Sequence, residues 1–308
     1  ISRVEDIEAL VKVGIVGLIP MQGKVSSRQG LATVMKGHKS TSGERIRSKL
    51  ILGQNEGSIF LESFRILGAN VQVIFGVGGR IKNKIIMITG SNPREGKSLI
   101  SSNLSVILAQ MGYDTLLVDT DIRKPDIETV FGLKEKTGGL TDVLLGKYEL
   151  EEIGNTVIRN ATDLMLGELG VTDVLERPWL NNLHILTAGT VAPNPVHLFH
   201  SNKLDETMQY LRQKYDVVIL DTAPILLVSD PIILAPKVDG ALLVYRVGMT
   251  SRITLRRAKA RIESIRGKQG INGLILNNVI PKLSMESYAS YYHKEYYLHD
   301  GNERKHRG

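Results

Sequence analysis

The sequence predicts an α/β fold in which a doubly wound, mostly parallel sheet is flanked by helices. From Lys82 onward, short apolar segments alternate with segments of helical periodicity, which is the pattern of parallel strands joined by right-handed helical crossovers. Three of the apolar segments end in polar or charged residues, and open parallel sheets bind their ligands where the strands end at the carboxyl side. The 308 residues suffice to bury a sizeable core.

The N-terminal quarter of the chain is expected to supply two helices and a strand. Apolar residues at helical spacing predict a short helix over 4–11, and the segment 13–20 predicts a strand that ends at a proline. The segment 57–73 predicts a longer helix with one apolar face, which Gly68 weakens by about 1 kcal/mol relative to alanine. The segment 21–50 is polar, basic and nearly aperiodic, so we expect it to be mobile.

The rest of the chain is expected to alternate regularly between strands and helices. Apolar segments predict strands near 84–89, 115–119, 183–187, 216–221, 240–246 and 272–277. Between them, helices are expected near 97–111, 126–132, 140–145, 195–213, 229–235 and 252–266. Asp230 is expected to cap one of these helices, with Pro231 at the first helical position.

Composition limits the classes of protein to which the chain can belong. It has no cysteine, so disulfides are excluded, and no apolar run reaches the roughly 18 residues that span a bilayer. The net charge of +7 is compatible with nucleic-acid binding, but aromatic residues are scarce and the single Trp179 offers no stacking series. Basic residues between 24 and 49 would suit either an anionic membrane surface or a solvated linker. We therefore expect no nucleic-acid partner.

The most informative segment is the expected strand over 84–89 and the loop after it, which ends in Gly96, Lys97 and Ser98. In such a loop the backbone N–H groups face inward, the lysine reaches the β and γ phosphates, and the serine hydroxyl ligates Mg²⁺. Because Ser91 stands where the motif has its first glycine, an ordinary strand-turn-helix is the alternative. The nucleotide-binding residues of this loop are expected to be Pro93, Arg94, Glu95, Gly96, Lys97, Ser98 and Leu99.

Two acidic motifs strengthen the prediction of a nucleotide site. One apolar segment ends in Asp119 and Asp121, which the period of a strand places on the same side. Another ends in Asp221, the arrangement of a Walker B aspartate that holds Mg²⁺ directly or through water. Alone, each aspartate is equally consistent with a helix cap or a surface turn. With the phosphate loop, the motifs predict that Mg²⁺ is held by Ser98, Asp119 and Asp221.

The C-terminal segment differs in character from everything before it. Five of the ten tyrosines lie within ten residues: Tyr288, Tyr291, Tyr292, Tyr296 and Tyr297. Their spacing follows neither a strand nor an amphipathic helix, so core packing does not explain the cluster. We expect a flexible tail whose aromatic side chains interact with a partner.

Taken together, these motifs resemble the bacterial tyrosine kinases, or BY-kinases, and specifically the cytoplasmic kinase domains of Wzc-like polysaccharide co-polymerases. The resemblance rests on the tyrosine tail and on the motifs at 4–8, 91–98, 119–123, 139–146, 193–195 and 221–224. It implies a P-loop NTPase fold of the MinD/BY-kinase type. ATPases of the MinD and ParA type carry a second lysine five residues ahead of the P-loop lysine, where this chain has Asn92. A non-kinase ATPase switch of that type, with the tail as a docking peptide, is the alternative.

The resemblance implies an ATP-dependent protein-tyrosine kinase that uses Mg²⁺ and phosphorylates its own tail tyrosines between subunits. It further implies a homo-oligomeric ring, for which the family suggests an octamer, on the cytoplasmic side of the bacterial inner membrane. The implied partners are the membrane portion of the co-polymerase, in cis or in trans, and a cognate tyrosine phosphatase. Regulation of exopolysaccharide and capsule synthesis and export is the implied role. Of the family's ring-packing motif, Glu62 and Arg65 match, while Gly68 replaces the second arginine.

For catalysis, phosphoryl transfer needs positioning more than covalent chemistry, and Lys97 is expected to neutralise phosphate charge. Asp119 is expected to accept or orient the tyrosine proton, with Asp121 aiding the metal or the tyrosine. Arg123 would either stabilise charge on the transferred group, bind the tail, or form a structural ion pair. Asn277 would contact adenine, by analogy with related ATPases, or be an ordinary turn asparagine.

Three parts of the chain are expected. Residues 1–81 would form an N-terminal helical and linker extension that packs on the core. Residues 82–282 would form the P-loop kinase core, and residues 283–308 a flexible tyrosine-rich tail.

Overall fold

The protein is described by a computed structural model, which covers residues 4–21, 50–51, 58–133, 138–162, 177–191 and 195–280. Within them the chain forms one eight-stranded sheet in the order β1-β8-β7-β2-β6-β3-β5-β4. All neighbouring strands are parallel except β4 and β5. The strands are β1 (Ile15–Pro20), β2 (Lys84–Gly90), β3 (Thr115–Asp119), β4 (Arg159–Asn160), β5 (Leu183–Leu186), β6 (Val217–Asp221), β7 (Gly240–Arg246) and β8 (Gly273–Val279). The expected α/β fold is confirmed.

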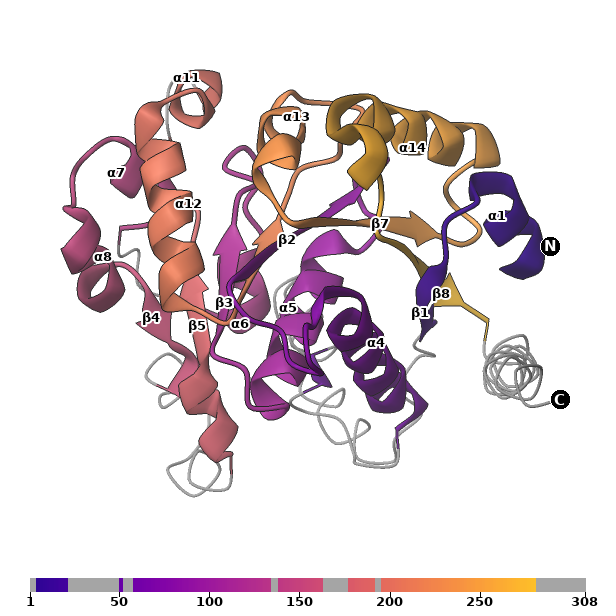
Figure 1. Ribbon diagram of the computed structural model, residues 1–308, viewed down its shortest axis with the longest axis horizontal. Helices are drawn as coiled ribbons and strands as arrows, with labels where there is room; N and C mark the ends of the chain where they lie inside the picture. Colours follow the sequence, from indigo (N-terminus) through magenta and orange to yellow (C-terminus); the bar gives the residue numbers. More distant parts are fainter. Residues whose placement is uncertain are drawn as a thin grey trace, which may run out of the picture.

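Helices cover both faces of the sheet (Figure 1). On one face lie α4 (Ile59–Phe75), α5 (Lys97–Gln110) and α6 (Ile127–Phe131). The other carries α1 (Val4–Val11), α7 (Leu140–Leu144), α8 (Leu150–Thr156), α11 (Pro195–Phe199), α12 (Asn202–Lys214), α13 (Asp230–Leu234) and α14 (Arg252–Arg266). Three short 3-10 helices complete the described elements: η2 (Pro178–Asn182), η3 (Ala235–Lys237) and η4 (Gly267–Gln269). No helix in the described ranges is long and apolar enough to cross a membrane.

The two helical layers follow from the period of the strands. In β2, Ile85 and Met87 pack into the cluster under α12 and α14, while Ile86 and Ile88 pack into the cluster under α4 and α5. Successive side chains of a strand point to opposite faces, so a strand that is apolar at every position must be buried on both sides. This burial places the central strands β2, β6 and β3 deep in the molecule, where every residue of the three strands except Lys84 is buried.

Most element boundaries agree with the expectations to within a few residues, and the differences have local causes. The expected helix over 195–213 is two helices, because the backbone at Ser201 is extended and starts α12 anew. The helix over 229–235 begins at Asp230, with Ser229 before it, so the assignment of Asp230 as the cap is wrong. The short elements α8, β4 and η2 were not expected, since none is long enough for its periodicity to be read.

Part of the expected N-terminal extension belongs to the sheet itself. Strand β1 pairs in parallel with β8 at the edge of the sheet, and α4 packs on β1 and α5. The edge strand and the helix that covers it therefore share a core with the strands that follow residue 82. Residues 22–49 of the segment 21–50, which was expected to be mobile, and the tail over 283–308 lie outside the described residues. The division into three parts stays a prediction.

Candidate nucleotide site

The phosphate loop lies between β2 and α5, at the carboxyl edge of the sheet. Helix α5 starts at Lys97, and the residue before it, Gly96, has a φ of +93°, a conformation that favours glycine. A Cβ atom at Gly96 would lie 2.2 Å from the side-chain nitrogen of Asn277, so the close approach also requires glycine. Because no side chain caps α5, its first N–H groups are available to an anion.

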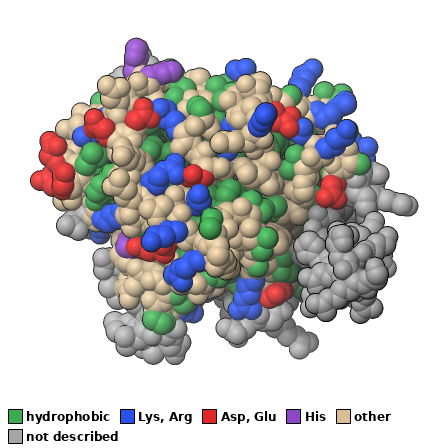
Figure 2. Space-filling model, in the orientation of Figure 1, with side chains coloured by type: hydrophobic (Ala, Val, Ile, Leu, Met, Phe, Trp, Pro, Cys, Tyr) green, Lys and Arg blue, Asp and Glu red, His purple; other side chains and the backbone are tan. Residues whose placement is uncertain are grey.

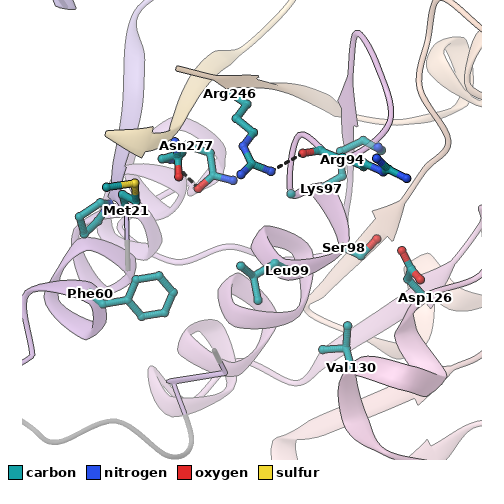
Figure 3. A pocket seen from close by; sticks show the side chains of 13 residues that line it. Met21, Phe60, Arg94, Lys97, Ser98, Leu99, Asp126, Val130, Arg246 and Asn277 are labelled. Atoms are coloured by element: carbon teal, nitrogen blue, oxygen red, sulfur yellow. Dashed lines mark hydrogen bonds between the residues drawn. The ribbon is translucent and has the colours of Figure 1, made fainter. Parts of the chain in front are cut away.

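A cavity of about 400 Å³ opens beside this loop. At one end, Lys97, Ser98 and the backbone of the loop face the cavity; at the other, Met21, Phe60 and Leu99 form an apolar wall (Figure 3). The remaining lining residues are Pro20, Arg94, Gly96, Asp126, Val130, Arg246, Asn277 and Asn278. A cationic end next to an apolar end matches a nucleotide, whose phosphates are charged and whose base is flat and largely apolar.

A buried carboxylate holds the loop from within. Glu95 is fully buried, and its two carboxylate oxygens accept hydrogen bonds from the Ser91 N–H at 2.6 Å and from the Thr250 hydroxyl at 2.5 Å. Burial raises the pKa of Glu95, and these hydrogen bonds partly offset the rise. The side chain of Glu95 therefore shapes the loop and does not line the cavity.

Two side chains from neighbouring strands hold the same loop from outside. Asn277, in β8, donates from its amide to the carbonyl of Glu95 at 2.8 Å. Arg246, at the end of β7, donates to the carbonyl of Arg94 at 2.7 Å, a contact that a dashed line in Figure 3 marks. Arg94 itself has a φ of +64°, so the loop needs such support to keep a conformation that arginine rarely adopts.

Two aspartates meet at the ends of adjacent strands. Asp119 of β3 and Asp221 of β6 are register partners in the parallel pair, and both are almost fully buried. Burial raises both pKa values; the charge of Asp221 raises that of Asp119 further, and hydrogen bonds from Ser98 and Ser101 to Asp221 oppose the rise there. Two like charges this close are stabilised by a cation between or beside them.

Asp119 also organises the segment that follows it. One carboxylate oxygen accepts from the Asp121 N–H at 3.1 Å, and the other accepts from the N–H groups of Asp126 and Ile127, at 3.2 and 3.1 Å, at the start of α6. This geometry supports a positioning role for Asp119 beside any role toward a metal. Asp121 is only partly buried, which leaves it the more accessible carboxylate of the pair.

Threonine hydroxyls fix the strand ends that carry the aspartates. Thr120 donates to the carbonyl of Asp221 at 2.7 Å, and Thr222 donates to the carbonyl of Ile88 at 3.0 Å. Thr89 joins β2 to the loop after β6 in the same way. Sequence reasoning missed these residues, although each lies at or directly after the end of an apolar strand. They tie β2, β6 and β3 together at the edge where the site lies.

Arg123 forms an ion pair with a distant acid. Its guanidinium donates two hydrogen bonds to the carboxylate of Asp230, at 2.6 and 3.0 Å, and Asp230 is almost fully buried. These hydrogen bonds raise the pKa of Arg123. Of the interpretations open from the sequence, the geometry favours the structural ion pair, which joins the segment after β3 to the start of α13.

The site has features that fit both a nucleotide and Mg²⁺. The Ser91 hydroxyl is buried at the start of the loop and has no hydrogen-bond partner among the described residues, so it leaves a polar atom for a ligand or water to satisfy. The described ranges contain no cluster of three or more His, Cys, Asp or Glu side chains arranged as a metal site. Mg²⁺ does not need one, because one or two carboxylates, waters and substrate phosphates commonly hold it.

The sequence-predicted site residues other than Arg123 divide into four groups. Those lining the cavity are Arg94, Gly96, Lys97, Ser98, Leu99 and Asn277. Asp221 lies directly behind them, linked by the Ser98 hydroxyl, with Asp119 and Asp121 on the next strand. Pro93 and Glu95 belong to the loop but do not line the cavity. The five tail tyrosines lie outside the described residues, so their expected role stays a prediction.

Comparisons with known proteins agree with this geometry. Residues 83–238 match a family model described as an AAA domain. The chain is 33% identical over 254 residues to the tyrosine-protein kinase YwqD of Bacillus subtilis, covering 82% of this chain and 95% of YwqD. It is 32% identical over 205 residues to the tyrosine-protein kinase etk of Escherichia coli K12, covering 66% of this chain and 25% of etk. The solved kinase domain of the Escherichia coli tyrosine kinase ETK superposes with a TM-score of 0.70 at 25% identity, covering 91% of this chain and 95% of that domain.

This chain covers very different shares of the two relatives. It spans nearly all of YwqD but only a quarter of etk. The shared part therefore corresponds to a kinase unit that occurs as a whole chain in one relative and as a fraction of a longer chain in the other.

Proposed function

Because this chain belongs to the bacterial tyrosine-protein kinases, we propose that it transfers the γ-phosphate of ATP to tyrosines of its own C-terminal cluster, between subunits. The observation that carries the proposal is the meeting of a lysine-bearing phosphate loop with two buried aspartates at one sheet edge, in a chain with five clustered tyrosines. ATP is the phosphate donor and the tail is the acceptor.

Lys97 and the loop N–H groups bind the ATP phosphates, while the apolar wall around Phe60 and Leu99 receives the adenine. Asn277 acts on the nucleotide through the loop that it holds and through its place in the cavity lining. Mg²⁺, bound near Ser98, Asp119 and Asp221, supplies charge neutralisation on the phosphates.

In the transfer step, the phenol oxygen forms a bond to the γ-phosphorus while the bond to the bridging oxygen of ADP breaks. The phenol proton has to leave, because an unperturbed tyrosine has a pKa near 10. Asp119 would accept or orient this proton, with Asp121, the more exposed of the two, aiding the metal or the tyrosine. Arg123, held by Asp230, keeps the segment that bears both carboxylates against α13.

Regulation follows from charge. Each phosphotyrosine adds a charge of about −1.5 to −2 at neutral pH, so a phosphorylated tail is repelled by the carboxylates of Asp119, Asp121 and Asp221. Phosphorylation then disperses the ring that the unphosphorylated tails hold together, and a phosphatase resets it. By its family resemblance, the protein serves exopolysaccharide or capsule synthesis and export at the cytoplasmic side of the bacterial inner membrane, with a co-polymerase membrane portion in cis or in trans.

A complementation assay tests transfer between subunits. One variant, Lys97→Met, keeps the tail but loses the phosphate contact, and the other replaces the five tail tyrosines with phenylalanine but keeps the site. Neither alone is expected to acquire phosphotyrosine with Mg²⁺ and ATP, whereas their mixture is expected to label the tail of Lys97→Met. A mixture that stays unlabelled while wild type is labelled excludes transfer in trans.

A further inference from the structure

The outward face of α14 is a basic stripe. Its exposed residues recur at helical spacing and include Arg256, Arg257 and Arg261, with Lys268 just beyond the end of the helix. None of the exposed residues of α14 is an aspartate or glutamate. Arg257 and Arg261 are about one turn apart and Arg256 adjoins Arg257, so the three side chains start within about 8 Å of one another along the helix axis.

The charges of this stripe are not neutralised within the described part of the chain. No ion pair there involves Arg256, Arg257, Arg261 or Lys268. The helix has one acid, Glu263, and it is already paired with Lys259 at 2.5 Å. Figure 2 shows Lys and Arg side chains gathered at the upper right of the molecule, where Figure 1 has α14. An anionic ligand would find several guanidinium groups with free donors.

We propose that the basic stripe of α14 binds the tyrosine tail of this chain once the tail is phosphorylated. The inference rests on the proposed function, because only a phosphorylated tail has the necessary charge. Planar guanidinium groups bind phosphate with two parallel hydrogen bonds, and adjacent arginines can share neighbouring phosphotyrosines. An anionic lipid surface is the other occupant with matching charge. It would favour apolar side chains interleaved with the arginines, and among the exposed residues of α14 the only large one is Ile253, at one end.

Chain length brings the tail within reach of α14. The last described residue, Ile280, follows β8, and β8 lies beside β7, from whose end α14 begins. Tyr288 is eight residues further on, a span of up to about 26 Å, and Tyr297 can reach further still. The tail and the basic stripe therefore start from the same edge of the sheet.

Phosphorylation would switch this contact on. The segment 284–297 has two glutamates and one lysine, so without phosphate it is nearly neutral and has little attraction for a basic helix. Five phosphates make it strongly anionic. The product tail would then leave the aspartates at the ends of β3 and β6 and be retained on α14, so that it does not compete with the next acceptor.

Synthetic peptides test the inference independently of the kinase activity. Two fluorescent peptides of residues 284–297, one with phosphotyrosine at the five tyrosine positions and one unmodified, are titrated into the purified full chain and binding is followed by anisotropy. The phosphopeptide is expected to bind about tenfold or more tightly than the unmodified peptide, and to weaken as salt is raised. Equal affinity for both peptides, or no salt dependence, overturns the inference.

Variants locate the binding surface. Replacing Arg256, Arg257 and Arg261 with glutamine should weaken phosphopeptide binding about tenfold. A matched control, which replaces Lys82, Lys203 and Lys214 with glutamine, removes the same charge away from α14 and should bind as wild type does. Equal losses in both variants would mean attraction by net charge alone, and overturn the inference. Each variant is first checked for unchanged thermal unfolding, and Arg257→Gln and Arg261→Gln alone give the same test in milder form.

Vesicles separate the phosphopeptide from a membrane. Co-sedimentation with phosphatidylglycerol vesicles is measured for wild type and for the α14 variant. If the variant loses vesicle binding but binds the phosphopeptide unchanged, the stripe is a lipid-binding surface and the inference is wrong. Because the peptides carry synthetic phosphate, absent binding refutes only the docking, whereas absent phosphate transfer from ATP refutes the proposed function.

Discussion

The surroundings of individual buried carboxylates in this protein shift their pKa values in opposite directions. Burial raises the pKa of Glu95, Asp119 and Asp221, because the hydrogen bonds they accept do not fully replace water. Asp142 is also buried, and burial alone would raise its pKa, but hydrogen bonds from Lys147, Thr190 and the backbone lower it to about 2. The raised values lie at the proposed ATP site, where bound cations would relieve them, whereas Asp142 is satisfied by the protein itself.

Replacing Asp142 with asparagine should destabilise the protein by about 2 to 3 kcal/mol. One carboxylate oxygen accepts from the N–H groups of Gly139 and Thr190, and the other from the Lys147 ammonium and the Thr190 hydroxyl. In the asparagine variant one of these two acceptor oxygens becomes an NH₂ group. Because NH₂ is itself a donor, it cannot accept the hydrogen bonds that the oxygen accepted. Urea unfolding at neutral pH measures the loss, and Asp205→Asn, at an exposed ion pair, is the control expected to change stability by less than about 0.5 kcal/mol.

The lowered pKa of Asp142 predicts how the stability difference between wild type and Asp142→Asn depends on pH. Since folding lowers the pKa of Asp142 from its ordinary 3.8 to about 2, its ionised form stabilises the native state above pH 3.8. That contribution should disappear as the pH falls from 3.8 toward 2, where the carboxyl becomes protonated in both states. The difference between wild type and Asp142→Asn should therefore shrink over this interval. A difference that stays constant down to pH 2 would contradict the assignment.

For single residues, the sequence predicted the positions of those that act together with their neighbours in the chain. Lys97 and Ser98 follow their loop directly, so spacing predicted their position at the cavity. Spacing could not decide the partner of Arg123, because Asp230 is 107 residues away. The buried hydrogen bond from Thr250 to Glu95 spans 155 residues and was equally invisible. Contacts between distant residues depend on the order of strands, which no local pattern contains.

The phosphate loop is an element held by its neighbours. Helix α5 and strand β2 fix its ends, while the segments at the ends of β7 and β8 supply hydrogen bonds to its middle. Arg94, at a positive φ, gives the loop backbone strain that these contacts oppose. Its preorganisation for phosphate therefore depends on residues of other elements, which hold the loop through hydrogen bonds.

Replacing Thr250 with valine should raise the KM for ATP several-fold with a smaller effect on kcat. Valine keeps the shape of threonine but removes the donor to Glu95, so the buried carboxylate is less stabilised and the loop is less well held. Steady-state kinetics over a range of ATP concentrations measures both constants. The control Thr254→Val removes a hydroxyl that bonds Ser251 at the start of α14. An equal effect of both variants would contradict a specific role for Thr250.

Helices α4 and α5 approach each other closely at Gly68. A Cβ atom there would lie 2.5 Å from the Cγ2 atom of Ile107 and 3.2 Å from the sulfur of Met111. The glycine that weakens the helix in the sequence therefore permits its packing. It also faces the interior, unlike Glu62 and Arg65, so an arginine at this position would not fit without rearrangement.

Gly68→Ala should destabilise the protein, although alanine favours a helix by about 1 kcal/mol over glycine. The branched side chain of Ile107 cannot rotate its methyl group away freely, so overpacking of about 1 to 3 kcal/mol should exceed that gain. Thermal and denaturant unfolding measure the change. The control is Ala69→Gly, the reverse exchange at the next position, which is exposed. It should lower stability by about 1 kcal/mol, the difference in helix propensity without any change in packing. A stabilised Gly68→Ala would contradict the close contact.

Elements with strong periodicity were predictable, and short ones were not. Three expected elements agree closely with the structure: the strands over 84–89 and 240–246 with β2 and β7, and the helix over 252–266 with α14. In each of them, apolar residues occupy most positions of the buried face, so the periodicity is clear from the sequence. The two-residue strand β4 is defined only by pairing with β5, which local propensity cannot reveal.

For the whole molecule, the sheet order explains why separated motifs form one site. Strand β2 lies between β6 and β7, and β3 lies beside β6, so the phosphate loop and both acidic motifs end at the same edge. Alternation of strands and helices predicted a parallel sheet, but it did not predict that β1 joins the edge beside β8. That pairing brings Pro20 and Met21 to the cavity, and no local pattern indicated that these residues would line it.

The measurement that tests the central claim most directly is the transfer of labelled γ-phosphate from ATP, in the presence of Mg²⁺, with mass-spectrometric mapping of the modified residues. The account predicts phosphotyrosine at residues 288–297 in wild type, and none in Lys97→Met or in the variant whose five tail tyrosines are phenylalanine. If wild type hydrolyses ATP and its tail tyrosines stay unmodified, or if Lys97→Met alone labels its own tail, the account is contradicted.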